Sequence, residues 1–416
     1  MLHANEKFAE QGLRVLAIAS ADLSLEEFKS EKDLFKHVEN LTFVGLTAME
    51  DPLRPETHEA IQLCNKAGIH VMMITGDHKT TACAIAHQLG LTGEAVTGAE
   101  LNNMSDQNLA QRIKDISVFA RVAPEDKVRI VQALKRTKNV VAMTGDGVND
   151  APALKNADIG VAMGATGTDV AKEAASMVLT DDNFSTIVKA VKEGRTIYSN
   201  IVKFVRFQLS TNFGAILAVF LAPILGFPAP FNAIQILLVN VIMDGPPALS
   251  LGLDKSRPEI MHDPPRGLKS NIINWPRITR LIFYGIIMAA GTLGILYYGL
   301  HAMNSQKAHT LAFTTFVLFQ LFNVFNVRHE KETIFTRYFF VNGKLWLSII
   351  CVVIFQMFIV YWPSLQDVFR TSSLSLNNWL LAIIVASSIV WFDECYKLIC
   401  RVRNAKASKS TRCSSF

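Results

Sequence analysis

Charged residues are scarce in this 416-residue sequence: Asp, Glu, Lys and Arg make up 19% of it, whereas soluble domains average about 25%. Hydrophobic residues account for 50%, and the mean hydropathy is +0.26. The scarcity is uneven, because charged and apolar residues alternate up to about residue 183 and six long apolar runs follow. This distribution excludes a purely soluble protein and also a purely membrane-embedded one.

Cysteine is scarce as well, and the six that occur show no Cys-x-x-Cys spacing. The sequence therefore indicates neither a disulfide framework nor a zinc site.

The first twelve residues lack a charged segment followed by an apolar one, so we expect no cleavable leader and infer that an internal helix directs membrane insertion. The net charge is only +5, and we expect no nucleic-acid partner.

An α/β fold is predicted for the part before residue 183. Short apolar segments rich in β-branched residues predict strands, and segments of helical character lie between several of them. The expected strands are 13–20, 41–49, 69–75, 116–120, 140–144, 159–163 and 177–179, and the expected helices are 79–89, 124–135 and 151–156. Such alternation is typical of βαβ units around a parallel sheet, which binds ligands at the carboxyl ends of its strands.

The part after residue 183 predicts a helical membrane bundle. One long helix is expected over 183–221, with a basic first half and an apolar second half. The expected spans are about 198–221, 231–253, 277–300, 309–327, 345–362 and 379–398, each close to the ~20 residues that a helix needs to cross a bilayer.

The charge of the flanking segments predicts the orientation. Segments 254–276, 328–344 and 397–416 hold 14 Lys and Arg residues, whereas the alternating segments 226–230, 301–308 and 363–378 hold 2. By the positive-inside rule, we expect the basic flanks, the soluble domain and the C-terminus on the cytosolic side. Lipid binding is an alternative role for the basic tail.

Two polar clusters in the soluble part suit phosphate chemistry. Thr75, Gly76 and Asp77 end a strand with a hydroxyl, a glycine and a carboxylate, and a hydroxyl and a glycine amide can hold phosphate oxygens. Pro124 marks a helix start, and Lys127 follows three residues later, where an ammonium could neutralise a transferring phosphoryl group. Taken alone, the first cluster is more typical of an ordinary capped turn and the second of a solvated helix.

A third cluster, residues 143–154, holds Asp146 and Asp150 in a glycine-containing loop after an apolar strand. Two carboxylates four residues apart suit Mg²⁺, which favours oxygen ligands and substrate phosphates. Helix capping by Asn149 or Asp150, with Pro152 in the first turn, is the alternative. Capping accounts for one carboxylate and the proline, but not for the whole segment.

Asp244 lies within the second expected span. A carboxylate at the bilayer centre costs ~2.5–3.5 kcal/mol on insertion scales, so an intramembrane Asp is a candidate functional residue. The segment Gly245-Pro246-Pro247 cannot continue a regular helix, and the carbonyls freed beside the carboxylate would form an oxygen-rich cation site. Asn240, one turn earlier, would share the face of Asp244. Pairing of Asp244 with a polar neighbour is the structural alternative.

Together these motifs and the string Asp-Pro-Leu-Arg at 51–54 resemble the phosphorylation domain of a P-type cation-transporting ATPase, which has a haloacid dehalogenase-like α/β fold. The resemblance covers residues 13–402 and implies ATP and Mg²⁺ as cofactors. It implies catalytic roles for Thr75, Gly76, Asp77, Lys127 and Asn149, Mg²⁺ binding by Asp146 and Asp150, nucleotide binding by Arg14, Arg54 and Arg121, and cation transport by Asn240, Asp244 and Asn212. For Asn212, hydrogen bonding between helices is an alternative.

The resemblance is to the C-terminal portion of such a pump. It implies the end of a nucleotide-binding domain at 1–40, a phosphorylation domain without its first strand at 41–182, a stalk helix and six spans at 183–400, and a basic cytosolic tail at 401–416. The family's Asp-Lys-Thr-Gly-Thr motif, whose aspartate accepts the γ-phosphate of ATP, does not occur in this sequence. We therefore expect the chain alone to form no phosphoenzyme.

Three positions indicate a subtype. Where the family's two-calcium pumps carry Glu, Thr and Glu, this sequence has Ala215, Met243 and Gln320, which resembles the single-site secretory-pathway Ca²⁺/Mn²⁺ pumps and their bacterial relatives. Oxygen-only ligands suit both ions. The sequence contains no Cys-Pro-Cys motif, which would indicate a copper or zinc pump. The expected membrane is the plasma membrane in a bacterium or a secretory-pathway membrane in a eukaryote.

We therefore expect an integral membrane protein that forms the C-terminal portion of an ATP-driven pump for Ca²⁺ or Mn²⁺. The alternative is a catalytically incompetent membrane fragment, or a subunit that needs a separate chain to supply the phosphorylated Asp.

Overall fold

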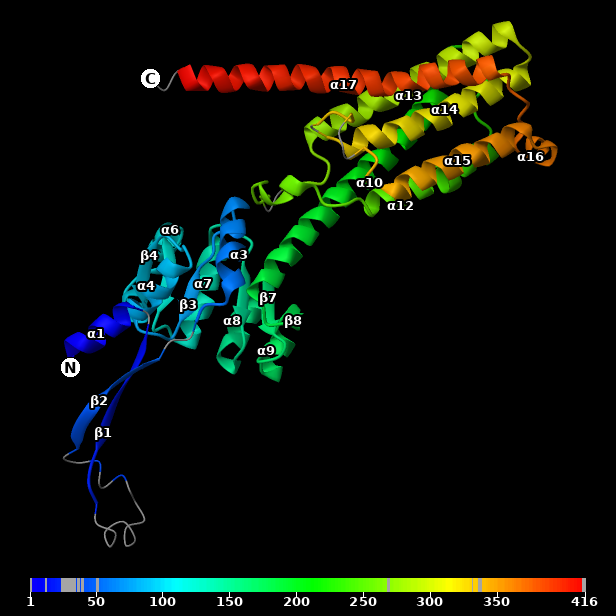
Figure 1. Ribbon diagram of the computed structural model, residues 1–416. Coiled ribbons are helices and arrows are strands. Elements are labelled where there is room, and N and C mark those ends of the chain that lie inside the picture. The colour runs from blue at the N-terminus through cyan, green and yellow to red at the C-terminus, as the bar shows by residue number, and fades with distance from the viewer. Residues whose placement is uncertain are drawn as a thin grey trace. The chain divides into compact units, whose positions relative to one another are not determined.

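The computed structural model describes residues 2–11, 13–23, 35, 38, 41–49, 52–267, 270–330, 332–335 and 339–413 (Figure 1). The chain forms two units, Met1–Lys192 with Pro258–Ser270 and Glu193–Arg257 with Asn271–Phe416.

The first unit contains two three-stranded parallel sheets. β3 (Met73–Thr75), β5 (Ile116–Ala120) and β4 (Glu94–Thr97) are neighbours in that order, and β6 (Ala142–Gly145), β7 (Ile159–Met163) and β8 (Met177–Leu179) form the other sheet. The central strand β5 is buried at all five positions, as expected for a strand covered on both faces. The α/β fold with parallel strands is thus confirmed.

One prediction about the strands is wrong. β1 (Arg14–Ser20) and β2 (Thr42–Met49) pair with each other in an antiparallel two-stranded sheet and belong to neither parallel sheet. Apolar side chains such as Leu16, Ile18 and Phe43 are exposed. A parallel sheet requires helices on both faces, whereas the described residues leave these apolar side chains of β1 and β2 uncovered.

The helices of the first unit begin at recognisable signals. Thr97 and Glu100 form a capping box at α5, Ser105 and Thr168 cap α6 and α9, and Pro124 is the first residue of α7. The helices are α1 (Leu2–Glu10), α3 (Pro55–Lys66), α4 (Lys79–Gln88), α5 (Gly98–Asn102), α6 (Asp106–Arg112), α7 (Pro124–Arg136), α8 (Ala151–Asn156) and α9 (Asp169–Ala174), with 3₁₀ turns η2 (Val148–Asp150) and η4 (Pro258–Met261).

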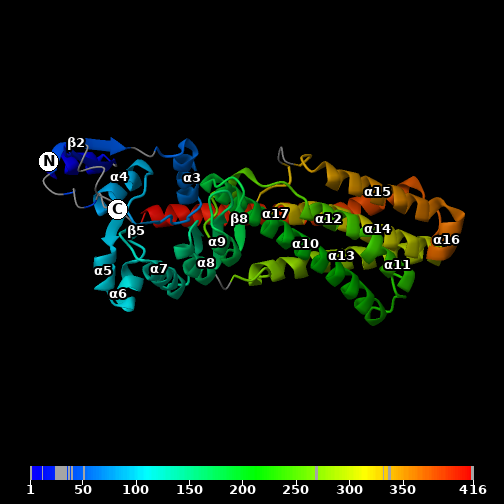
Figure 2. The same ribbon diagram turned by 90° about the horizontal axis from the view of Figure 1, so that it is seen from below.

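All the described elements of the second unit are helices (Figures 1 and 2). It consists of α10 (Phe184–Ile224) from Glu193 onward, α11 (Ala233–Leu238), the π-helical segment η3 (Val239–Met243), α12 (Gly245–Gly252), α13 (Trp275–Ala302), α14 (Ser305–Arg328), α15 (Gly343–Tyr361), α16 (Pro363–Phe369) and α17 (Leu376–Cys413). Within the described residues, six helical stretches are long and apolar enough to cross a membrane, which matches the expected six.

Helix α14 lies at the centre of this bundle. In the apolar 18-residue stretch of α14, 94% of the residues are buried, whereas in the corresponding stretches of the other five candidate spans at most half are buried. Figures 1 and 2 show α13 and α17 alongside it. Polar side chains on α14 therefore face other helices and not lipid.

Candidate functional site

The predicted phosphate residues lie in loops that follow parallel strands of the first unit. Thr75 ends β3, Arg121 follows β5, and Asp146 follows β6. The backbone amide of Arg121 donates to the carbonyl of Asp77 at 3.2 Å, which joins the loops after β3 and β5. Ile74 of β3 packs against the apolar cluster that contains Met143 of β6, so the strands that precede these two loops share one part of the core.

The loop after β3 is organised by its own polar groups. The Thr75 hydroxyl donates to Asp77 Oδ2 at 2.8 Å and accepts from the Asp77 amide at 3.1 Å. Gly76 and Asp77 are exposed, and Thr75 is half-buried. The carboxylate of Asp77 therefore orients the hydroxyl that the sequence assigns to phosphate binding.

Asp150 and Lys127 form a half-buried ion pair that joins α7 to the loop after β6. Lys127 Nζ donates to Asp150 Oδ1 at 2.5 Å, while Oδ2 accepts from the amides of Asp146 and Gly147 at 3.2 and 3.1 Å. Burial alone would raise the pKa of Asp150, but Lys127 and these amides outweigh it and hold this pKa below its usual value. Glycine at position 145 lets Asp150 approach the backbone of this loop, because a Cβ there would lie 2.4 Å from the Asp150 Cβ.

The other predicted Mg²⁺ ligand, Asp146, and the predicted catalytic residue Asn149 face outward. Asp146 and Asn149 are both exposed, whereas Asp150 is occupied by Lys127 and the loop amides. Over the described ranges, no three His, Cys, Asp or Glu side chains gather closely enough to hold a metal ion by themselves. Oxygen atoms of Asp146 and Asn149 at this loop still fit Mg²⁺, which binds through one or two carboxylates together with water and substrate phosphate.

The three predicted nucleotide-binding arginines stand at different elements of the first unit. Arg121 is exposed beside Asp77 with a backbone φ of +51°. Arg54 precedes α3, and its guanidinium donates to the carbonyl of Asp182 at 2.5 Å. Arg14 begins β1, and its side chain lies outside the described residues. Asp51 also lies outside them.

Asp244 is completely buried in the second unit, at an interruption of the second candidate span. Its amide donates to the carbonyl of Val239, five residues earlier, at the end of the π-helical segment η3. Pro246 and Pro247 have no amide hydrogen for the carbonyls of Ile242 and Met243. The interruption thus combines a buried carboxylate with backbone oxygens inside the helical bundle, as a membrane cation site requires.

The two oxygens of the Asp244 carboxylate have different surroundings. Oδ2 accepts from the Thr211 hydroxyl at 3.0 Å, whereas Oδ1 is buried and has no donor among the residues that the structure describes. A buried acceptor without a partner costs ~1–3 kcal/mol, and more when it is charged. A bound cation would satisfy Oδ1.

The helix α14 adds polar groups that the sequence analysis did not assign to the site. Asn323 Nδ2 donates to the Ser210 hydroxyl at 2.8 Å, next to Thr211 on α10. Asn323 Oδ1 and the whole amide group of Gln320 are buried without a partner in the described part. The spacing of Gln320, Asn323 and Asn326 was the available signal, since residues three apart share a helix face.

Asn240 and Asn212 are placed differently from Asp244. Asn240 is exposed and Asn212 is half-buried, whereas Asp244 is fully buried. Asn240 lies inside η3, and a π-helical segment departs from the α-helical period on which the shared face was predicted. Ion binding by the two asparagines stays a prediction.

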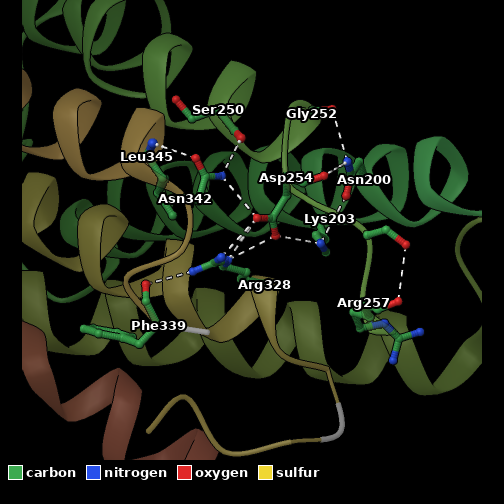
Figure 3. Close-up of polar contacts among 11 residues, drawn as sticks. Asn200, Lys203, Ser250, Gly252, Asp254, Arg257, Arg328, Phe339, Asn342 and Leu345 are labelled. Atoms are coloured by element: carbon green, nitrogen blue, oxygen red, sulfur yellow. Dashed lines mark hydrogen bonds and ion pairs between the residues drawn. The ribbon is translucent and has the colours of Figure 1, made fainter. Parts of the chain in front are cut away.

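The end of α12 is fixed by a buried ion network around Asp254 (Figure 3). Lys203 Nζ on α10 donates to Asp254 Oδ2 at 2.8 Å, and Arg328 at the end of α14 donates to both oxygens at 3.0 to 3.3 Å. Asn342 before α15 donates to Oδ1 at 3.2 Å, and Asn200 donates to the Asp254 carbonyl at 2.7 Å. Burial raises the pKa of Asp254, but Arg328 and Lys203 more than reverse this and lower it.

Comparison with known proteins agrees with this architecture. Residues 228–399 match the family model of the cation transporting ATPase C-terminus, and residues 6–158 and 127–191 match models of haloacid dehalogenase-like hydrolases. The chain is 43% identical over 419 residues to calcium-transporting ATPase 1 of Bacillus cereus, with 96% of this chain and 46% of that protein covered.

Yeast and mouse proteins give similar values. Calcium-transporting ATPase 1 of Saccharomyces cerevisiae is 42% identical over 407 residues, which cover 96% of this chain and 42% of the relative. Calcium-transporting ATPase type 2C member 1 of Mus musculus is 40% identical over 420 residues, which cover 100% and 44%. The chain thus spans less than half the length of these relatives.

The chain thus combines a haloacid dehalogenase-like unit with six candidate membrane spans among its described residues, as expected for an integral membrane protein. Over most of its length, the chain matches the C-terminal portion of P-type cation-transporting ATPases. The resemblance inferred from the sequence motifs is confirmed.

Proposed function

We propose that this chain is the C-terminal portion of an ATP-driven pump that carries Ca²⁺ or Mn²⁺ across a membrane through a single site. The observation that carries the proposal is Asp244, a fully buried carboxylate with one unpartnered oxygen at a proline-containing helix interruption. Relatives named calcium-transporting ATPases support Ca²⁺ as the ion. Asn240 and Asn212 are the further proposed ligands.

In the first unit, the proposed phosphate site consists of groups with separate tasks. Thr75 and Gly76 would hold phosphoryl oxygens, Lys127 would neutralise their charge, and Asp146 with Asn149 would hold Mg²⁺, which supplies charge stabilisation when bound. Asp150 contributes through Lys127 and the loop amides that it organises. ATP would be bound with the help of Arg14, Arg54 and Arg121.

The domain boundaries at 40, 182 and 400 and the cytosolic placement of the soluble unit and the C-terminus stay part of this proposal. The 14 basic residues in one set of flanks, against 2 in the other, support the orientation.

The alternative, a fragment or subunit that needs a separate chain, is favoured by the missing Asp-Lys-Thr-Gly-Thr string. Labelling with [γ-³²P]ATP tests whether the purified chain can phosphorylate itself. We expect no acid-stable, hydroxylamine-sensitive label on the purified chain, because it carries no aspartyl nucleophile of that motif.

The functional proposal itself is tested in a chimaeric pump, in which this chain follows the N-terminal part of the Bacillus cereus relative. The chimaera should be labelled in a Ca²⁺-dependent manner, and Asp244→Asn should abolish the label. Asp393→Asn is the matched control, because Asp393 is also buried but contacts Tyr284 and Lys397 instead of the helix interruption, and Lys397 keeps a second anionic partner, Glu394, at 3.1 Å. Ca²⁺-dependent label in the Asp244→Asn variant would refute the site assignment.

A further inference from the structure

Asp182, two residues before α10, uses both carboxylate oxygens to hold a loop of the first unit. Oδ1 accepts from the amides of Gly164 and Ala165 at 2.6 and 3.0 Å. Oδ2 accepts from the amide and the hydroxyl of Thr166, both at 2.8 Å. Four donors on one carboxylate fix the loop that joins β7 to α9, residues 164–168.

The same loop reaches the predicted Mg²⁺ segment. The amide of Thr168 donates to the carbonyl of Asp146 at 2.8 Å. The loop between these contacts is tightly packed: a Cβ at Gly164 would lie 2.5 Å from the Leu179 carbonyl oxygen, and one at Gly167 would lie 2.0 Å from that of Met163. A displacement at Asp182 would therefore reach Asp146 through only a few residues with little room to adjust.

On its other side, Asp182 is fixed to the start of α10 and to α3. Its carbonyl accepts from Arg54 at 2.5 Å, and its φ of +47° is a conformation that L-residues rarely adopt without such support. The next residue, Asn183, donates its side-chain amide to Glu56 of α3 at 2.8 Å. Ile187 in the first turn of α10 packs against Val161 and Leu179, which belong to β7 and β8.

We propose that Asp182 is a positioning residue that holds the 164–168 loop, and through it the Asp146 backbone, against the first turn of α10. The inference rests on the proposed Mg²⁺ role of Asp146. Since α10 continues as one helix from Phe184 to Ile224, Asp182 would be the junction at which a change at the phosphate site is passed to α10. Coupling requires such a contiguous set of contacts.

Asp181 provides a matched control. Its carboxylate accepts from the amide of Asn183 at 3.2 Å and from the hydroxyl of Thr186 at 2.6 Å, both at the start of α10. Asp181→Asn thus makes the same charge change one residue away and perturbs the helix start instead of the loop.

The first measurement is hydrogen exchange on the purified full chain in detergent. An Asn at 182 can accept from Gly164 and Ala165, but its NH₂ group cannot accept from Thr166. In Asp182→Asn we expect amide exchange at Thr166 and Thr168 to become at least about tenfold faster, because charge-assisted hydrogen bonds to the loop are lost. In Asp181→Asn we expect the exchange rates of both amides to stay unchanged. Unchanged exchange at Thr168 in Asp182→Asn would overturn the proposal.

The second measurement is the Mg²⁺ dependence of phosphorylation of the chimaera by inorganic phosphate. Asp182→Asn should raise the half-saturating Mg²⁺ concentration by about tenfold while the maximal level changes little, as for outer-shell substitutions at metal sites. Thr166→Val, which removes one neutral donor, should raise it by about threefold. Asp181→Asn should leave it unchanged.

Asp146→Asn separates the two claims. If Asp146→Asn loses phosphorylation, the proposed function stands. If the Mg²⁺ dependence is then unchanged in both Asp182→Asn and Thr166→Val, the role of Asp182 is refuted. Full phosphorylation of Asp146→Asn would refute the proposed Mg²⁺ site itself, and with it the inference.

Discussion

At the scale of single residues, Asp150 illustrates how a motif residue acts inside the protein. Both of its oxygens are occupied, one by Lys127 and the other by the amides of Asp146 and Gly147. The twelve-residue motif is therefore not a row of equivalent ligands: Asp150 shapes the loop, and Asp146 and Asn149 face outward from it.

Replacing Lys127 should expose this dependence. In Lys127→Met, the buried Asp150 loses its charged donor, and we expect the free energy of unfolding of the first unit to fall by about 1–3 kcal/mol. Lys79→Met removes an exposed pair with Glu100 and should cost less than about 1 kcal/mol. Thermal unfolding of the full chain, followed by a probe in the first unit, measures both; equal losses would contradict the account.

Asp182 predicts a pH dependence. The amide of Ala165, followed by the groups of Thr166 and Gly164, lowers the pKa of Asp182 from 3.8 to about 2. A carboxylate whose pKa is lower in the folded state stabilises the fold above its unfolded pKa, and this contribution is lost as the pH falls through the folded value. Exchange protection of the 164–166 amides should therefore decrease between about pH 4 and pH 2. In Asp182→Asn this pH dependence of exchange protection should disappear. If the pH dependence persists in that variant, a group other than Asp182 causes it.

At the scale of elements, α12 is held at both ends. Asp244, the residue before α12, accepts from Thr211 of α10. Asp254, two residues after the end of α12, accepts from Lys203, which also lies on α10. Two contacts on α10, eight residues apart, thus fix the position of the interrupted span. The π-helical segment η3 and the two prolines give the span its gap, and these contacts hold the gap in place.

Asp254→Asn should destabilise the bundle strongly. The variant leaves Lys203 and Arg328 buried without their anion, which typically costs ~3–5 kcal/mol. Asp367→Asn, at an exposed position of α16, should leave stability nearly unchanged. Denaturation of the full chain in detergent compares the two variants, and similar midpoints would show that the network contributes little.

The sequence predicts elements better than their contacts. Apolar, β-branched segments located β5, β6, β7 and β8, whereas the four-residue strand β4 has too little pattern to be recognised. Hydropathy located six spans but could not tell that α14 is central, because burial against neighbouring helices does not alter composition. Pairs far apart in sequence, such as Thr211 with Asp244 and Lys127 with Asp150, depend on the tertiary fold and have no signal in local spacing.

At the scale of the whole molecule, the chain combines two kinds of oxygen-rich site in two units. The first unit presents hydroxyl, amide and carboxylate groups in loops after parallel strands, and the second buries a carboxylate at a helix interruption. Residue types at strand ends and within an apolar span were enough to predict both from the sequence. The positioning groups, Asp182 for the first and Thr211 for the second, became visible only in the structure.

The central claim is that Asp244 belongs to the transport site for Ca²⁺, and ATP-driven uptake of ⁴⁵Ca²⁺ into vesicles that contain the chimaeric pump tests it most directly. The account predicts uptake by the chimaera and by its Asp393→Asn variant, and none by Asp244→Asn, because an amide cannot replace the charge of the only fully buried carboxylate at the described helix interruption. Uptake by Asp244→Asn at the rate of the unsubstituted chimaera would contradict it.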